Sequence, residues 1–235
     1  MFAFLNKFGI VVTRSRNVIP EKRMNVSISR ELNGVNLFVD VGANSGQTYN
    51  RIRTLGFSGT YLAIEPEFSS FQKLLQLQTT DKNLICISQA IGKDAKVLDL
   101  NISSNEALSS SLLTFSEAHR LAAPEIDMVD TQSVPVSPLS AILDKLEHSS
   151  IFLKIDVQGY ELEVLKGIND FDWGRICGLL IECNLVSTYE GSAFIEEVFS
   201  LLRQKGFHPY RLENGFGATN FGQQLQVDVL FKRLQ

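Results

Sequence analysis

Charged side chains stand within or at the end of several apolar runs of this sequence. Lys154 and Asp156 lie in IFLKIDV, and Glu182 closes GLLIE. Because burying an unpaired charge is costly, such residues belong either in ion pairs or at the edge of a cleft. In a cleft, Asp156 can act as a general base that removes a proton from a hydroxyl group, with Lys154 beside it. A structural ion pair between Lys154 and Asp156 is the alternative interpretation.

A turn that contains two glycines follows the apolar run at 35–41. Gly42 and Gly46 stand where a strand would pass into a helix, and the first N–H groups of that helix have no partner within it. Glycine at these positions would let the backbone approach a ligand closely. Glu65 follows 19 residues beyond Gly46, at the end of a second apolar run, where an acidic side chain can accept both ribose hydroxyls. The spacing predicts a cofactor that contains adenosine.

The same turn favours S-adenosylmethionine over NAD. It reads GANSG instead of GxGxxG, so it lacks the middle glycine that admits a pyrophosphate. Asp40, directly before the turn, would repel a diphosphate but tolerate the cationic amino acid portion of S-adenosylmethionine. An NAD-dependent oxidoreductase and a catalytically silent cofactor-binding scaffold protein remain as alternatives.

Apolar segments of strand length alternate with helical segments along most of the chain. Strands are expected at 35–41, 60–66, 83–92, 150–159, 175–184 and 225–234, with a further alternating segment at 95–103. Helices are expected at 46–56, 68–78, 161–168 and 192–206. The alternation predicts an α/β fold with a mostly parallel sheet, helices on both faces, and a ligand site at the carboxyl ends of the strands. The serine-rich stretch at about 104–140, which contains three prolines, is expected to be an irregular insertion.

Composition and the first residues limit the partners and the location of the protein. The net charge of −4 argues against a protein devoted to nucleic acid, which needs clustered Lys and Arg. We expect residues 1–34 to be a basic leader that packs on a domain at 35–235 or makes weak contact with a membrane surface. Asn6 and Lys7 interrupt the apolar start, and no apolar run approaches the roughly 18 residues of a membrane span. The protein is therefore expected to be cytoplasmic.

An ordered set of motifs resembles the FkbM family of S-adenosylmethionine-dependent methyltransferases. The motifs are FVDVGANSGQT, AIEP, QAIG, SSSLL, LKIDVQGYELEVLKG, LLIECNL and LQVDVLF, spread over about residues 35–233. The resemblance implies a class I methyltransferase fold, which is Rossmann-like with a seven-stranded sheet, and O-methylation of a sugar, glycan or natural-product acceptor. This chain reads KIDVQG, with Gln158 where many similar proteins have the glutamate of KIDVEG. Ser140 stands where they have the aspartate of a leucine-aspartate pair. Both departures put the acceptor-side roles in doubt.

The resemblance also implies roles for single residues. The methionine portion is expected to contact Asp40, Gly42, Asn44 and Gly46. The ribose is expected to contact Glu65 and Pro66, and the adenine edge to contact Gln89 and Ala90. Asp156 is expected to reach the cofactor as well. The residues expected to bind the acceptor are Ser110, Ser111, Gln158 and Glu182.

Two arrangements for removing the acceptor proton stay open. In the first, Asp156 is the general base and His119, within the insertion, is its competitor. In the second, Asp156, Glu182 and Asn184 hold a divalent cation that acidifies the hydroxyl group. We favour the base, because no further acidic cluster appears at these strand ends. The acceptor is expected to be a small molecule or a glycan, and its identity does not follow from the sequence because loops vary over a common scaffold.

Overall fold

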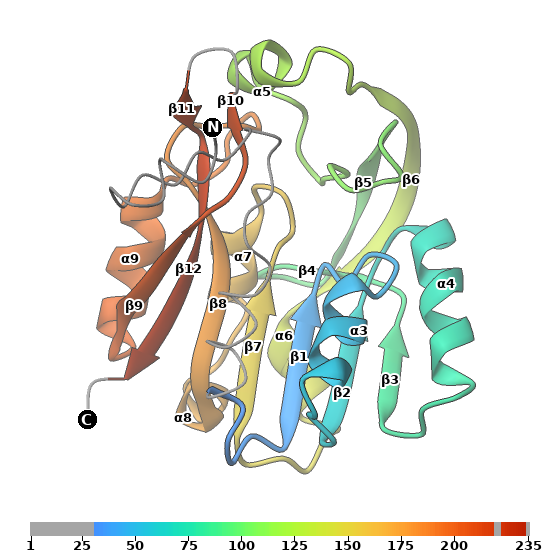
Figure 1. The fold of residues 1–235 in the computed structure, drawn as a ribbon, viewed down its shortest axis with the longest axis vertical. Helices are drawn as coiled ribbons and strands as arrows, with labels where there is room; N and C mark the ends of the chain where they lie inside the picture. Colours follow the sequence, from blue (N-terminus) through green and yellow to red (C-terminus); the bar gives the residue numbers. More distant parts are fainter. Residues whose placement is uncertain (1–30, 219–221, 234–235) are drawn as a thin grey trace, which may run out of the picture.

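A seven-stranded sheet forms the centre of the molecule (Figure 1). The computed structural model describes residues 31–218 and 222–233. The strand order is β3-β2-β1-β7-β8-β12-β9, and β12 runs antiparallel to the other six strands of this sheet. In that order the strands are Leu84–Ile87, Thr60–Ile64, Leu37–Val41, Ile151–Ile155, Ile176–Asn184, Gln226–Arg233 and Phe207–Asn214.

Helices cover both faces of this sheet, because successive strand residues point to opposite sides. Leu37, Val39 and Val41 of β1 belong to one apolar core, whereas Phe38 belongs to the other. The core on the Phe38 side includes residues of α3 (Gln47–Thr54) and α4 (Phe68–Gln78). The opposite core includes residues of α6 (Leu139–Leu143), α7 (Glu161–Lys166), α8 (Asp170–Arg175) and α9 (Ile195–Gln204). The predicted α/β fold with a mostly parallel sheet is confirmed.

A second sheet of three strands lies beyond the carboxyl ends of β1, β2 and β3 (Figure 1). Its order is β4-β6-β5, with β4 at Ala90–Ile91, β6 at Met128–Ser137 and β5 at Lys96–Ser103. The strand expected at 83–92 is therefore split, because β3 and β4 belong to different sheets. A short two-stranded sheet of β10 (Gly217–Ala218) and β11 (Gln223–Gln224) completes the strands described here.

The stretch at 104–140 is less irregular than expected. It contains α5 (Glu117–Ala122) and the ten-residue strand β6. Only Val134 and Val136 of β6 are buried, and its first half is polar or exposed, so the sequence has little alternation there. Pairing with β5 makes this segment a strand, which is a contact between residues distant in sequence. Strand β9 was missed for a similar reason, since it is an edge strand that contains Pro209.

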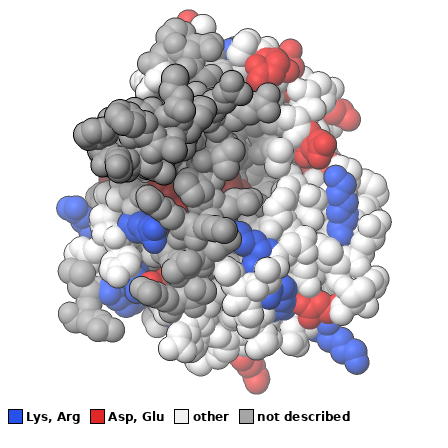
Figure 2. Space-filling model, in the orientation of Figure 1, with Lys and Arg blue, Asp and Glu red and all other residues white. Residues whose placement is uncertain are grey.

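The basic leader and its membrane contact concern residues that lie, apart from 31–34, outside the described part of the chain. Within the described ranges, no helix has both the length and the apolar character needed to cross a membrane. The face drawn in Figure 2 carries both signs of charge, with Lys and Arg side chains at several separate places and Asp and Glu between some of them.

Candidate cofactor and active site

A cavity of about 250 Å³ lies at the carboxyl ends of β1, β2 and β7. This is the edge at which parallel α/β sheets bind ligands, and where the sequence predicts the site. The inserted segment after β5 supplies one wall. The polar and small residues that line the cavity include Gly42, Asn44, Gln47, Thr48, Glu65, Pro66, Gln89, Ala90, Ala107, Ser110, Lys154, Asp156, Gln158 and Tyr160.

Glu65 directly follows β2 and is held by two backbone N–H groups. Asn44 N–H donates to Oε2 and Glu67 N–H donates to Oε1, each at 2.8 Å. Each carboxylate oxygen keeps a second lone pair, so Glu65 can still accept one hydroxyl at each oxygen. Burial raises the pKa of Glu65 to about 7, although the two N–H groups act in the opposite direction.

At both glycines of the turn, neighbouring protein atoms leave no space for a side chain. Gly42 has φ of +83°, and a Cβ there would lie 1.9 Å from the carbonyl oxygen of Asp156. Gly46 has φ of +91°, and its Cβ would lie 2.6 Å from a methyl carbon of Leu77 on α4. Both positions therefore need glycine for backbone conformation and packing. Gly42 lines the cavity, but the described lining does not include Gly46, in contrast to the expected contact with the methionine portion.

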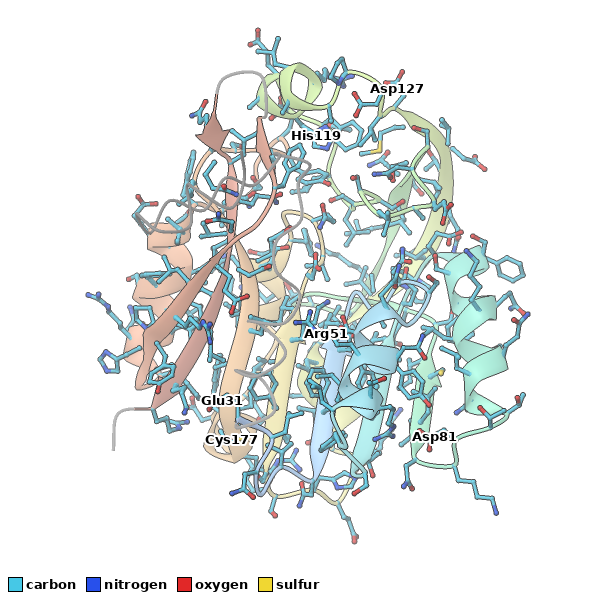
Figure 3. The ribbon with its side chains drawn as sticks, in the orientation of Figure 1. Glu31, Arg51, Asp81, His119, Asp127 and Cys177 are labelled. Carbon is cyan, nitrogen blue, oxygen red and sulfur yellow. The ribbon has the colours of Figure 1, made fainter. Side chains whose placement is uncertain are left out.

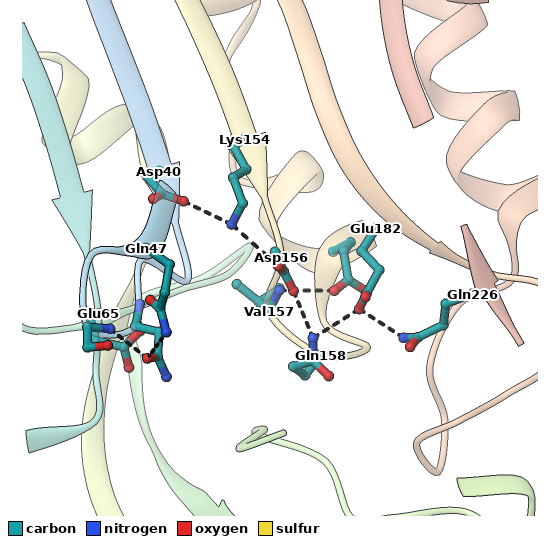
Figure 4. A network of polar contacts seen from close by, with 12 residues as sticks. Asp40, Gln47, Glu65, Lys154, Asp156, Val157, Gln158, Glu182 and Gln226 are labelled. Atoms are coloured by element: carbon teal, nitrogen blue, oxygen red, sulfur yellow. Dashed lines mark hydrogen bonds and ion pairs between the residues drawn. The ribbon is translucent and has the colours of Figure 1, made fainter. Parts of the chain in front are cut away.

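Asp40 lies behind the cavity wall instead of against the cavity. It is fully buried, and its carboxylate accepts a hydrogen bond from the Tyr61 hydroxyl at 2.6 Å. It also accepts one from Lys154 Nζ at 3.0 Å (Figure 4). Strand pairing sets Asp40 directly opposite Lys154. The structure therefore does not support the expected contact between Asp40 and the methionine portion, because Asp40 is fully buried and is not among the described lining residues of the cavity.

Lys154 links the buried Asp40 to Asp156 on the cavity wall. Its Nζ lies 3.4 Å from Asp156 Oδ2. Burial alone would lower the pKa of Lys154, but attraction to Asp40 and Asp156 outweighs burial and raises it. Lys154 therefore stays positively charged and cannot itself act as a base.

Asp156 follows the end of β7 and has 36% of its side chain exposed. Gln158 lies beside it with φ of +57° and joins it to Glu182 on the neighbouring strand (Figure 4). The Gln158 amide nitrogen donates to Asp156 Oδ1 at 2.7 Å and to Glu182 Oε2 at 3.0 Å. The side-chain oxygen Oε1 of Gln158 accepts a hydrogen bond from the Tyr189 hydroxyl at 2.7 Å. Gln158 lines the cavity, but both of its amide hydrogens are used within the protein, so it offers no donor to an acceptor molecule.

A second cavity of about 170 Å³ shares Thr48, Lys154 and Asp156 with the first. Glu182 and Asp228 line it as well. Burial and repulsion from Asp156 raise the pKa of Glu182 well above its usual value and that of Asp228 to about 7. Asp228 faces Glu182 across the β8–β12 pairing and was not among the residues predicted from the sequence. Its position within the apolar run VDVLF is the kind of signal that pointed to Asp156.

The remaining residues on the cofactor and acceptor side divide into two groups. Pro66, Ala90 and Gln89 line the larger cavity as expected, and the Gln89 amide donates to Ser137 Oγ at 2.7 Å. Ser110 also lines it. Ser111 is buried and donates to the carbonyl oxygen of Gln158 at 2.6 Å, so it supports the main chain and has no place among the described lining residues.

The structure does not bring His119 to the cavity. His119 is buried on α5, where its ring stacks on Phe115 with 3.7 Å between ring centroids. Figure 3 shows it well apart from the ends of β1 and β7. Burial lowers the pKa of His119 to about 4. The competitor role predicted for His119 is therefore not supported by its position.

The metal arrangement requires the side-chain oxygen of Asn184, which already accepts two hydrogen bonds within the protein. Asn184 is buried, and its Oδ1 accepts from the Thr188 hydroxyl at 2.7 Å and from the Gln226 amide at 3.1 Å. Between Asp156 and Glu182, the Gln158 amide occupies the place that a cation would take. Among the described residues, no group of three or more His, Cys, Asp and Glu side chains is arranged to hold a metal ion.

Comparison with known proteins shows similarity in sequence to a curated methyltransferase and in fold to solved structures. Methyltransferase sdnD of Sordaria araneosa is 40% identical over 55 residues, which are 23% of this chain and 19% of that protein. The crystal structure of methyltransferase FkbM from Methylobacillus flagellatus KT has a TM-score of 0.48 at 14% identity and covers 83% of this chain and 43% of its own. Precorrin-6y C5,15-methyltransferase from Geobacter metallireducens GS-15 has a TM-score of 0.49 at 10% identity, with coverage of 95% and 93%.

A family model matches the greater part of the chain. The chain spans less than half of the length of the first two proteins named above. The model described as the methyltransferase FkbM domain matches residues 40–209, which include the cofactor-side turn, Glu65, Asp156 and Glu182. Because this match covers well over half of the 235 residues, the chain belongs to the methyltransferase FkbM domain family.

Proposed function

We propose that this chain is an S-adenosylmethionine-dependent O-methyltransferase that acts on a hydroxyl group of a sugar, glycan or natural-product acceptor. Its family supports methyl transfer. The observation that carries the choice of oxygen is the Asp156 carboxylate, which lies where the two cavities meet. A hydroxyl group must lose its proton when it is methylated, and a positioned carboxylate is a suitable acceptor of that proton.

The residues of the larger cavity fit S-adenosylmethionine. Glu65 has one free lone pair at each oxygen, which suits the two ribose hydroxyls. Gln89 and Ala90 are next along the wall and can meet the adenine edge, while Ile91 and Leu100 offer apolar surface to its ring. When bound, this cofactor supplies an electrophilic methyl group.

The chain's own residues then align the acceptor and manage its proton. Lys154, held by Asp40, lies 3.4 Å from Asp156 Oδ2, so a positive charge stands beside the carboxylate that accepts the proton. Glu182 and Asp228 line the adjoining cavity, where their oxygens can bind further hydroxyl groups of an acceptor. Holding the reactants in line can contribute about 7–11 kcal/mol, and a general base about 10² to 10⁴ in rate.

Two experiments test this proposal in sequence. First, S-adenosylmethionine is expected to raise the melting temperature of the full chain, whereas NAD is not. The opposite result would favour the oxidoreductase. Second, a panel of hydroxylated sugars, glycans and natural products is offered together with methyl-labelled S-adenosylmethionine. Binding of the cofactor without transfer to any member of the panel would favour the catalytically silent scaffold.

A further inference from the structure

The Gln158 side chain makes three hydrogen bonds at the candidate active site. Its side chain contacts three elements, since it reaches Asp156 after β7, Glu182 on β8 and Tyr189 in the segment after β8. Its main chain is fixed as well, because Ser111 from the inserted segment donates to its carbonyl oxygen. Gln158 has a left-handed backbone, which is unfavourable for a residue other than glycine, and such a conformation persists only where the surroundings hold it.

The network holds Asp156 at both oxygens. Gln158 donates to Oδ1 at 2.7 Å, and Lys154 lies 3.4 Å from Oδ2 (Figure 4). Glu182 receives the other hydrogen of the same amide and a second hydrogen bond from Gln226 at 2.9 Å. One neutral NH₂ group thus supplies a hydrogen to each of two neighbouring carboxyl groups without adding charge. A carboxylate at position 158 would instead face two others.

We propose that Gln158 is the positioning residue of Asp156, and that it does not bind the acceptor. Its amide takes the place of a cation between Asp156 and Glu182 and fixes the carboxylate in one orientation. The Tyr189 hydroxyl directs the NH₂ end of the amide toward the two carboxyl groups, because it donates to the other end. This inference rests on the proposed role of Asp156 as the base.

Titration of the Asp156 carboxyl group tests the proposal without an acceptor. The full chain is labelled with ¹³C at the aspartate side-chain carboxyl carbons, and the Asp156 resonance is identified by its loss in Asp156→Asn. Gln158→Leu removes a hydrogen bond that favours the anionic carboxylate, so the titration midpoint of Asp156 is expected to move up by about one pH unit. Tyr189→Phe should move it in the same direction by less, and it serves where Gln158→Leu fails to fold.

Gln226→Leu is the matched control, because Gln226 donates to Glu182 but not to Asp156. Its midpoint shift is expected to stay below about one third of that in Gln158→Leu. The charged and titratable groups that face Asp156 are Asp40, Lys154, Glu161, Glu182, Tyr189 and Asp228, with Arg51 across the second cavity. They are present in both variants, so the difference between the variants reports the amide of Gln158.

Equal midpoints in wild type and Gln158→Leu, or equal shifts in both leucine variants, would overturn the proposal. With an acceptor from the screen above, Gln158→Leu should lower kcat about tenfold while acceptor KM changes less than about twofold. A raised KM with unchanged kcat would instead identify Gln158 as an acceptor-binding residue. If no acceptor is methylated but the midpoint moves as expected, the proposed function fails and the contact between Gln158 and Asp156 stands.

Discussion

Replacement of Glu65 by alanine is expected to weaken S-adenosylmethionine binding at least tenfold. Two hydrogen bonds from ribose hydroxyls to a carboxylate contribute about 1.5–3 kcal/mol each, and every 1.4 kcal/mol is about tenfold in Kd. Less than the full sum should be lost, because the pKa of Glu65 is about 7 and a part of the free protein is protonated at neutral pH. Calorimetry on the folded variant measures the change directly.

The pH dependence of binding supplies a second measurement of the same residue. A protonated Glu65 must lose its proton before it can accept both hydroxyls, so Kd should rise as the pH falls below about 7, by up to about tenfold per pH unit. In Glu65→Ala this dependence should disappear. An unchanged affinity in that variant, or the same pH dependence as in wild type, would refute the assignment of the ribose to Glu65.

Glu67→Ala is the matched control for this experiment. Glu67 is two residues away and accepts from the backbone N–H groups of Ser69 and Ser70, so it caps the start of α4. Its loss should lower the free energy of unfolding by about 1 kcal/mol. Cofactor affinity should change little, because the described lining of the cavity does not include Glu67.

Four further perturbations address the chemistry of the site and the structural roles of single residues. Asp156→Asn keeps the shape and removes the charge, so turnover should fall about 10²-fold or more with little change in cofactor affinity, and near-normal turnover would exclude Asp156 as the base. Turnover should also survive a chelator, and activity that is lost and then restored by magnesium would favour the metal arrangement instead. Gly42→Ala should lower the free energy of unfolding, measured with urea, by clearly more than Gly56→Ala. Both glycines have positive φ, but only a Cβ at position 42 would lie against a carbonyl oxygen. Equal losses in the two variants would contradict this packing. The pKa of His119 is lowered to about 4, so as the pH falls the unfolded chain binds this proton before the folded chain does. Between about pH 6.5 and 4, wild type should therefore lose more free energy of unfolding than His119→Phe. Urea unfolding at several pH values measures this difference.

Local patterns in the sequence were sufficient for the strands that are buried on both faces. β1, β2, β7 and β8 are almost continuous apolar runs, and every residue of β1 is buried. Such a run can bury its apolar side chains on both faces only in a sheet that is covered on both sides. β6 and β9 lacked this signature, because partly exposed strands are held by pairing with distant segments and their own residues vary more freely.

The candidate site divides in the same way. Glu65 and Asp156 were found from the sequence, because acidic residues that end apolar runs fall at the edge where parallel strands meet. Neither the burial of Asp40 behind that edge nor the separation of His119 from it could be read from spacing, since both depend on which strands and helices become neighbours.

By itself, then, the sequence determined which residues are costly to bury and at which strand ends they lie. Only the tertiary structure decided their partners. Gly42 is required by the carbonyl of Asp156, and Gln158 is committed to Asp156, Glu182 and Tyr189, which are 2 to 31 positions away in the chain. Hydrogen bonds and steric contacts act over about 3 Å, so a role that depends on them is defined only once the fold has set the distances.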